Sequence, residues 1–251
     1  MGAFGVGQDQ VQFIATAFFA TMTASLLISP WVVDKLGVQL TFSISLVLFA
    51  IGSLISTFSP NLPVIIFGRV VQGFGSGIMQ PLVMMALVQA FPPERRGLAM
   101  GLFSLGIVCA HGVGPYMGGL TIDAFHWRFI FLLPLPIVVF AFVMGLLFLP
   151  SRVKGTNASF DWLGFALLSV SMFCMMTVIA NGQRDGWLSN SILVTFLIFL
   201  TTGAAFILTQ IYGKTRMMEL ALFRYIPFAA AIAISLVYGL VNFSAIYLYP
   251  V

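Results

Sequence analysis

The chain has 251 residues, of which 60% are hydrophobic and only 7% are charged, and its formal net charge is +4. A soluble globular domain carries about 25% charged residues. The composition therefore excludes an ordinary soluble domain and predicts an integral membrane protein. The apolar runs are continuous and do not alternate with polar residues, so they favour membrane-spanning helices over barrel strands.

Eight membrane-spanning helices are predicted, because each charge-free stretch can hold the roughly 20 apolar residues that cross a bilayer. Turn and breaker residues such as Ser29-Pro30 and Phe91-Pro92-Pro93 separate them. The short loops predict that consecutive helices pack as antiparallel neighbours. The predicted spans run near 9–29, 38–58, 63–91, 97–120, 127–149, 160–181, 189–212 and 225–251.

Most basic residues fall on alternate loops, which the positive-inside rule assigns to the cytoplasm. Residue 1 would then lie outside, opposite to the usual cytoplasmic start of a transporter, so we expect a further span before it. The end of the chain, 247–251, stops in apolar sequence, and a fragment cut at both ends is predicted. The basic residues on this side are Lys35, Arg95, Arg96, Arg152, Lys154, Lys214, Arg216 and Arg224.

Arg69 lies within the third span, far from any other charge along the chain. An arginine at the centre of a membrane helix costs about 2.5–3.5 kcal/mol on insertion scales, and Arg69 is roughly 9 Å inside the span's start. A snorkelling arginine is one interpretation. We favour a polar cavity, because a whole helical face is polar. That face consists of Arg69, Gln72, Gly73, Ser76 and Gln80.

A second motif lies late in the fourth span, where Ala110, Gly114 and Gly118 recur every four residues. Such a ridge of small residues lets two helix backbones approach closely. Pro115 removes a backbone donor and is expected to kink the helix. A pivot or seal is one interpretation, and ordinary helix packing is the other.

A third motif, Pro30 to Gly37, is predicted to lie in the first cytoplasmic loop. It places Asp34 and Lys35 beside a glycine turn at Gly37. Acidic and basic side chains at a helix end can form a latch with a neighbouring helix terminus.

These motifs resemble the major facilitator superfamily, specifically its fourteen-span drug:proton antiporters of the EmrB/QacA type. Arg69-x-x-Gln72-Gly73 is similar to the family's fourth-helix signature, and Gly114-Pro115-x-x-Gly118-Gly119 to its fifth-helix antiporter signature. Three further strings resemble family segments in the same order: Trp127–Phe131, Phe160–Gly164 and Leu222–Arg224.

The chain departs from the family pattern at three places. Pro30 opens the loop motif where the family usually has glycine, and two non-basic residues, Val38 and Gln39, close it. Ala110 replaces the glycine that opens the fifth-helix motif. No carboxylate lies deep in any span, so the proton-carrying acid that the family implies is expected outside this chain.

The resemblance implies an all-α helix bundle with part of the major facilitator fold. Residues 1–150 would form an N-terminal half lacking its first helix. Residues 151–224 would add two spans that link the halves, and 225–251 would begin the C-terminal half.

The resemblance also implies proton-coupled efflux of amphipathic small molecules from the bacterial inner membrane. Two halves would rock about a central site. The Arg69 face would couple charge to proton movement, and the helix with Gly114, Pro115, Gly118 and Gly119 would seal one access route. A periplasmic adaptor and an outer-membrane channel are possible partners.

Other functions are weighed against export. Uptake or export of one metabolite, such as a sugar or an organic acid, keeps the fold but not the antiporter signature. An enzyme would need nucleophiles or paired carboxylates clustered in the membrane, which the sequence lacks. No cofactor, metal site or nucleic-acid partner is expected, and Cys109 and Cys174 are interpreted as packing residues. His111, inside the fourth span, is a further candidate for a direct role.

Overall fold

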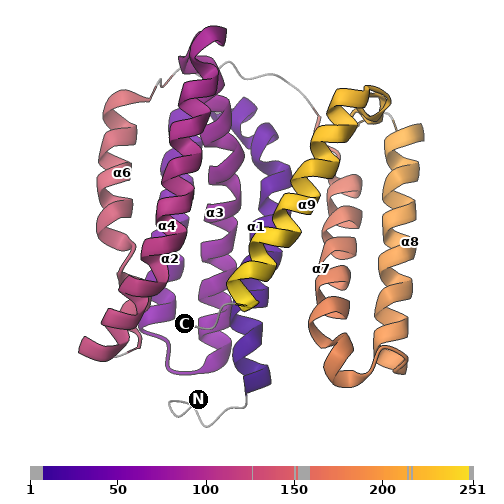
Figure 1. Ribbon diagram of the computed structural model, residues 1–251, viewed down its shortest axis with the longest axis horizontal. Coiled ribbons are helices and arrows are strands. Elements are labelled where there is room, and N and C mark those ends of the chain that lie inside the picture. The colour runs from indigo at the N-terminus through magenta and orange to yellow at the C-terminus, as the bar shows by residue number, and fades with distance from the viewer. Residues whose placement is uncertain are drawn as a thin grey trace.

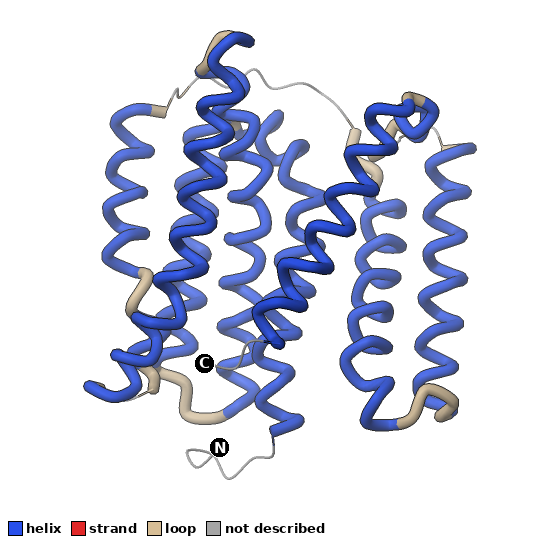
Figure 2. Tube along the Cα trace, viewed as in Figure 1, coloured by secondary structure: helices blue, strands red, loops and turns tan. Residues whose placement is uncertain are grey.

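The computed structural model describes residues 8–125, 127–149, 151, 159–213, 215 and 217–248, and side chains from residue 13 to residue 241 within these ranges. Every regular element in this part of the chain is helical (Figure 2). Some residues used in the sequence analysis lie outside the described ones: Arg152, Lys154, Lys214, Arg216 and the last three residues of the predicted final span.

The helices follow the predicted spans in order, and consecutive long helices run antiparallel (Figure 1). Seven helical segments of the described chain are long and apolar enough to cross a membrane, and the shorter apolar stretch Ile226–Val241 belongs to the predicted eighth span. The long helices are α1 Gln8–Leu36, α2 Val38–Thr57, α3 Leu62–Ala90, α4 Arg96–Ala124, α6 Leu135–Phe148, α7 Trp162–Asp185, α8 Asn190–Tyr212 and α9 Ile226–Leu248; the short ones are η1 Pro93–Arg95, α5 Phe129–Leu132 and η2 Leu220–Arg224.

The first predicted boundary was wrong, because α1 continues through Pro30 to Leu36. The segment predicted as a cytoplasmic loop is therefore the end of a helix. The turn to α2 consists of Gly37, whose φ of 80° lies in the left-handed region that favours glycine. This tight connection brings α2 back antiparallel to α1.

The predicted fifth span, 127–149, is interrupted. A turn at Leu133 and Pro134 separates α5 from α6. Pro134 and Pro136 have no backbone N–H, so neither can donate the hydrogen bond that would continue the helix. The break lies beside the cavity described below.

Helices α1, α2 and α3 pack together, and we call them the first bundle. Helix α3 is its centre, because it packs extensively against both α1 and α2. Its glycines permit this on two sides. A side chain at Gly73 would collide with the Phe18 carbonyl of α1, and one at Gly75 with the Ser45 carbonyl of α2. Since consecutive helices α1 and α2 contact one another less than either contacts α3, sequence adjacency alone did not predict the packing.

Short polar side chains fill the seam between these helices. Ser25, Ser29, Ser45, Ser53 and Ser56 are completely buried. Three of them donate to carbonyls one turn back in their own helix, and Ser29 donates across to the Ile78 carbonyl of α3 at 2.8 Å. Small, internally satisfied side chains let membrane helices approach closely.

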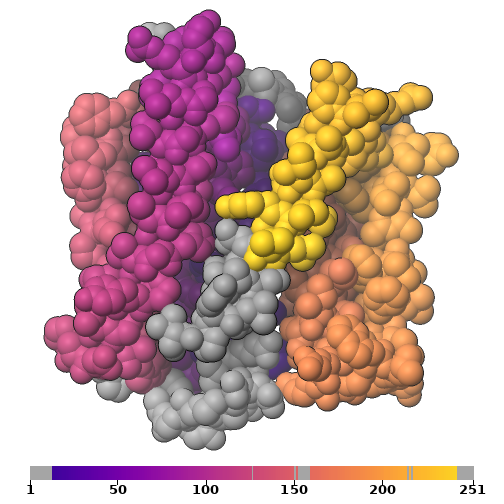
Figure 3. All heavy atoms as spheres, viewed as in Figure 1, coloured from indigo at the N-terminus to yellow at the C-terminus, as the bar shows by residue number. Residues whose placement is uncertain are grey.

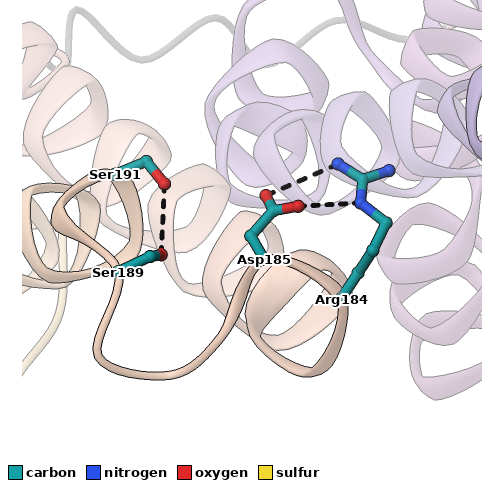
Figure 4. Close-up of polar contacts among 4 residues, drawn as sticks. All are labelled: Arg184, Asp185, Ser189 and Ser191. Atoms are coloured by element: carbon teal, nitrogen blue, oxygen red, sulfur yellow. Dashed lines mark hydrogen bonds and ion pairs between the residues drawn. The ribbon is translucent and has the colours of Figure 1, made fainter.

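Helices α7 and α8 form a hairpin at the side of this bundle (Figure 1). The hydroxyl of Ser171 donates to the Phe199 carbonyl across the pair at 3.3 Å. At the turn, Arg184 forms an ion pair with Asp185 at 2.8 Å, close to a hydrogen bond between the Ser189 and Ser191 hydroxyls (Figure 4).

A buried polar cluster ties the end of α8 to the start of α7, and we call it the clasp. Asp161 caps α7 by accepting from the Gly164 amide at 2.8 Å, and it accepts from Gln210 Nε2 at 2.7 Å. The Gln210 side-chain oxygen accepts from the amides of Met217 and Met218 in the segment leading to α9. Asp161 is 7% exposed and Gln210 is 1% exposed, and this buried carboxylate accepts two hydrogen bonds from neutral donors among the described residues.

An aromatic cluster joins the hairpin to the first bundle next to the clasp. Trp31 of α1 contacts Phe160 and Trp162, with ring centroids 5.2 and 5.6 Å apart. Phe165 closes the cluster one turn later, 5.7 Å from Phe160. Edge-on and tilted aromatic pairs add about 0.5–1.5 kcal/mol each beyond their buried area.

Helices α4 and α9 pack least. In the space-filling view α4 and the yellow α9 form separate ridges on the same face (Figure 3). Most described side chains of both helices are exposed. For apolar helices, exposed side chains mean contact with lipid or with another protein segment.

Candidate functional site

Arg69 lies on α3, two turns after Asn61 caps the helix by accepting from the Val64 amide. Its Nη1 donates to Gln72 Oε1 at 2.6 Å, and Gln72 Nε2 donates to Ser53 Oγ of α2 at 2.9 Å. These two hydrogen bonds link the Arg69 guanidinium, through Gln72, to α2.

Two aromatic rings complete the surroundings of Arg69. The guanidinium carbon lies 4.2 Å from the centroid of Phe18 on α1 and 6.0 Å from that of Phe131 on α5. A cation over an aromatic face gains about 2 kcal/mol or more when water is excluded. Arg69 Nε is buried, and among the described residues it has no hydrogen-bond acceptor and Arg69 has no carboxylate partner.

These groups line an open cavity of about 450 Å³ between α1, α2, α3 and α5, which we call the Arg69 cavity. Most of its wall is apolar, and Arg69 and Gln72 supply the polar groups. A small number of fixed polar groups in an apolar cavity is the usual composition of a small-molecule site. The lining residues are Ile14, Ala15, Phe18, Phe49, Arg69, Gln72, Ile130, Phe131 and Pro134.

The predicted polar face is only partly assembled at this cavity. Ser76 donates to the Gln72 carbonyl at 3.0 Å, one turn behind the lining residues. Gly73 packs against α1, and Gln80 is exposed beyond the cavity. Sequence spacing placed these residues on one face, but the crossing of α1 over Gly73 divides that face into a lining part and a packing part.

The antiporter motif lies on the exposed side of α4. Added side chains at Gly114, Gly118 and Gly119 would meet nothing within 4 Å, so no described helix makes the predicted close approach. Pro115 is inside the helix. His111 Nδ1 lies 2.8 Å from the Ile107 carbonyl one turn back, so its contact is within α4 and not with a neighbouring helix.

The expected charge latch belongs to the last turns of α1, not to a loop. Asp34 and Lys35 are both exposed. Lys35 Nζ lies 4.6 Å above the Trp31 ring, and in the part of the chain that the structure describes Asp34 forms no ion pair. Gly37 supplies the turn, as described above.

Sequence reasoning missed several groups. Ser53 was hidden among other serines, and only its position across from Gln72 distinguishes it. Phe18 and Phe131 are two of 26 phenylalanines, so composition gave no signal for their stacking on Arg69. Gln210 lies in an apolar run, and an isolated buried amide there is a signal that could have been read.

Comparison with known proteins agrees with these features. The family description Major Facilitator Superfamily matches residues 1–249. The multidrug export protein EmrB of Escherichia coli is 29% identical over 99% of this chain and 49% of its own length. The lincomycin resistance protein LmrB of Bacillus subtilis is 26% identical over 96% of the chain and 50% of its own length.

A third relative, the uncharacterized MFS-type transporter YhcA of Bacillus subtilis, is 27% identical over the whole chain and 47% of its own length. The chain therefore spans about half the length of these curated relatives. The family match and the seven apolar helices make it an integral membrane protein of the bacterial inner membrane. The chain belongs to the major facilitator superfamily.

Proposed function

We propose that this chain is the N-terminal part of a proton-coupled exporter of amphipathic small molecules that works by alternating access. The observation that carries the proposal is the Arg69 cavity. A fixed positive charge stands there between two aromatic rings, in a space of about 450 Å³ inside the membrane. EmrB and LmrB carry names that concern drugs, and the same substrate class is proposed here.

Arg69 is proposed to organise the cavity and to respond to proton movement. Its Nε has no acceptor among the described residues, so this N–H can donate a further hydrogen bond without breaking the bond to Gln72. A carboxylate from another part of the longer protein would satisfy it when ionised and release it when protonated. Substrate and proton would then compete for the same charged surroundings.

The division of the chain is part of the proposal. Residues 1–150 act as the N-terminal half, 151–224 as an added hairpin with its connections, and 225–251 as the start of the second half. The clasp and the aromatic cluster support treating the hairpin as a separate unit attached to the first bundle. The protein is proposed to be a transporter without an enzymatic reaction. An adaptor and an outer-membrane channel are proposed only by likeness to the family.

The test is efflux by the full-length protein in everted membrane vesicles, with ethidium as the amphipathic substrate and an imposed proton gradient. Arg69→Ala is expected to lower the efflux rate at least about tenfold, since removing a desolvated charge costs more than the 1.4 kcal/mol that a factor of ten represents. Arg69→Lys keeps the charge but loses the planar stacking surface, and an intermediate rate is expected.

Arg184→Ala is the matched control, because that arginine is exposed at the hairpin turn and pairs with Asp185 beside it in sequence. It should leave efflux near the wild-type rate. If Arg69→Ala inserts at normal yield and transports as fast as Arg184→Ala, the role given to Arg69 is wrong. If neither the wild type nor any variant moves ethidium, a neutral amphipathic dye or an anionic one, the substrate class is wrong.

A further inference from the structure

A second cavity lies on the other side of α1 from Arg69, between the first bundle and the hairpin. Its volume is about 220 Å³. Helix α1 contributes Phe13 and Ala17, α3 contributes Ile66, and α7 contributes Phe173, Thr177 and Asn181. We call it the hairpin cavity.

Helices α1 and α3 line both cavities, each with different residues. Phe13 and Ala17 face the hairpin cavity, while Ile14 and Phe18 face the Arg69 cavity. Neighbouring positions on a helix point about 100° apart, so residues one step apart can line different spaces. Arg69 lines only the Arg69 cavity, so a ligand in the hairpin cavity would not contact it.

The hairpin cavity has polar groups but no charge. None of its lining residues is acidic, basic or a histidine. Thr177 donates to the Phe173 carbonyl at 2.9 Å and keeps its acceptor lone pairs. Asn181 is half-buried, and no described residue forms a hydrogen bond with its side-chain amide. An amide in an apolar environment costs free energy until it is paired, so this group favours a ligand with a hydroxyl or a carbonyl.

Two of the phenylalanines that line the cavity are exposed on the outside of the helices. Phe13 is 47% exposed and Phe173 is 53% exposed, and both lie on helices that span the membrane. A ligand that partitions into lipid can therefore enter between α1 and α7. The volume is below the roughly 300–1,000 Å³ of drug-sized sites, which fits a molecule with a single aromatic ring.

We propose that the hairpin cavity binds neutral amphipathic molecules with one aromatic ring and one hydroxyl or carbonyl group, which reach it from the membrane. Phe13, Ile66 and Phe173 contact the ring, and the Asn181 amide pairs with the polar group. This proposal concerns ligand binding alone, so its test is independent of the export proposed for the Arg69 cavity.

The test is photolabelling of the full-length protein in lipid nanodiscs. The probe is 3-(trifluoromethyl)-3-phenyldiazirine carrying a hydroxymethyl group, and the competitor is 3-(trifluoromethyl)benzyl alcohol. After illumination, peptide mass spectrometry locates the adducts. We expect saturable adducts on segments 13–17 and 173–181 that excess competitor suppresses, while adducts on lipid-facing surfaces elsewhere are not suppressed.

Two variants of α7 separate the cavity from the lipid surface. Thr177→Trp fills the cavity and is expected to reduce the competitor-sensitive adducts at least tenfold. Ile179→Trp places the same ring on a position that is 60% exposed, and these adducts should persist. If Thr177→Trp does not fold, as judged by size-exclusion profile, Ala180→Leu fills the same cavity with a smaller change.

A third variant tests the amide. Asn181→Leu should weaken the hydroxymethyl probe by about three- to tenfold, the worth of one net hydrogen bond, without weakening the same probe lacking the hydroxyl. Adducts that the competitor never suppresses, or equal suppression in the Thr177→Trp and Ile179→Trp proteins, would overturn the proposal. Equal weakening of both probes by Asn181→Leu would overturn the role of the amide.

Discussion

Replacing Gly73 by alanine tests whether the crossing of α1 and α3 positions the Arg69 cavity. An alanine Cβ at this place would lie 2.5 Å from the Phe18 carbonyl oxygen and 3.3 Å from the Met22 amide. Both neighbours are backbone atoms, which cannot rotate away as a side chain can. Because ordinary contact begins near 3.4 Å, the helices must separate by about 1 Å.

The expected cost follows from overpacking a close helix contact, about 1–3 kcal/mol. The same separation would draw Phe18 away from the Arg69 guanidinium, which now lies 4.2 Å from the ring centroid. Gly73→Ala should therefore lower both the thermal stability of the detergent-solubilised protein and the rate of ethidium efflux. Fluorescence-detected size exclusion after heating measures the first, and everted vesicles measure the second.

The matched control is Gly97→Ala at the start of α4, where an added Cβ meets nothing within 4 Å. Alanine has the higher helix propensity, by about 1 kcal/mol, so this change should be neutral or slightly stabilising. If the Gly73→Ala protein is as stable and as active as the Gly97→Ala protein, the close crossing does not position the cavity and the reasoning fails.

Two further predictions concern the hairpin. Gln210→Leu would leave Asp161 without its 2.7 Å donor and the Met217 and Met218 amides without an acceptor, so the free energy of unfolding should fall by about 1–3 kcal/mol. Chemical denaturation measures this loss. A loss no larger than that of Tyr212→Leu, a residue that is 81% exposed, would contradict the role of the clasp. Because Trp31 of α1 contacts Phe160 and Trp162 at the start of α7, the hairpin should also move together with the first bundle. Double electron–electron resonance between spin labels at Val47 and Ile179 should give the same distance distribution in inward- and outward-facing conditions. A shift in this distribution would show that the hairpin moves separately.

The sequence predicted the helices well but not their neighbours. Apolar length located each span, since crossing a bilayer imposes a minimum length on any sequence. The sequence predicts a helix end at Pro30, yet Pro30 lies inside α1, because surrounding packing in a membrane can satisfy the backbone groups that proline frees. Pro134 and Pro136, two residues apart, do break the helix.

The sequence predicts only part of the candidate site, because it shows which residues share a helix but not which helices meet. Arg69 and Gln72 are three residues apart on one helix, so local geometry was enough to join them. Ser53 and Phe18 come from α2 and α1, and their positions depend on helix crossings at Gly68, Gly73 and Gly75. Glycine signals that backbones can approach, but not which helix approaches. For the latch residues Asp34 and Lys35 and the antiporter residues on α4, the sequence likewise does not indicate which helix approaches them.

The buried serines between α1, α2 and α3 also affect how the bundle responds to temperature. Water-driven cores lose strength on cooling because apolar hydration has a large heat capacity. Helices in lipid that meet through glycine and serine expose no new apolar surface to water when they part, and van der Waals contact and hydrogen bonds hold them. The first bundle should thus have a flat stability curve and resist dissociation in the cold.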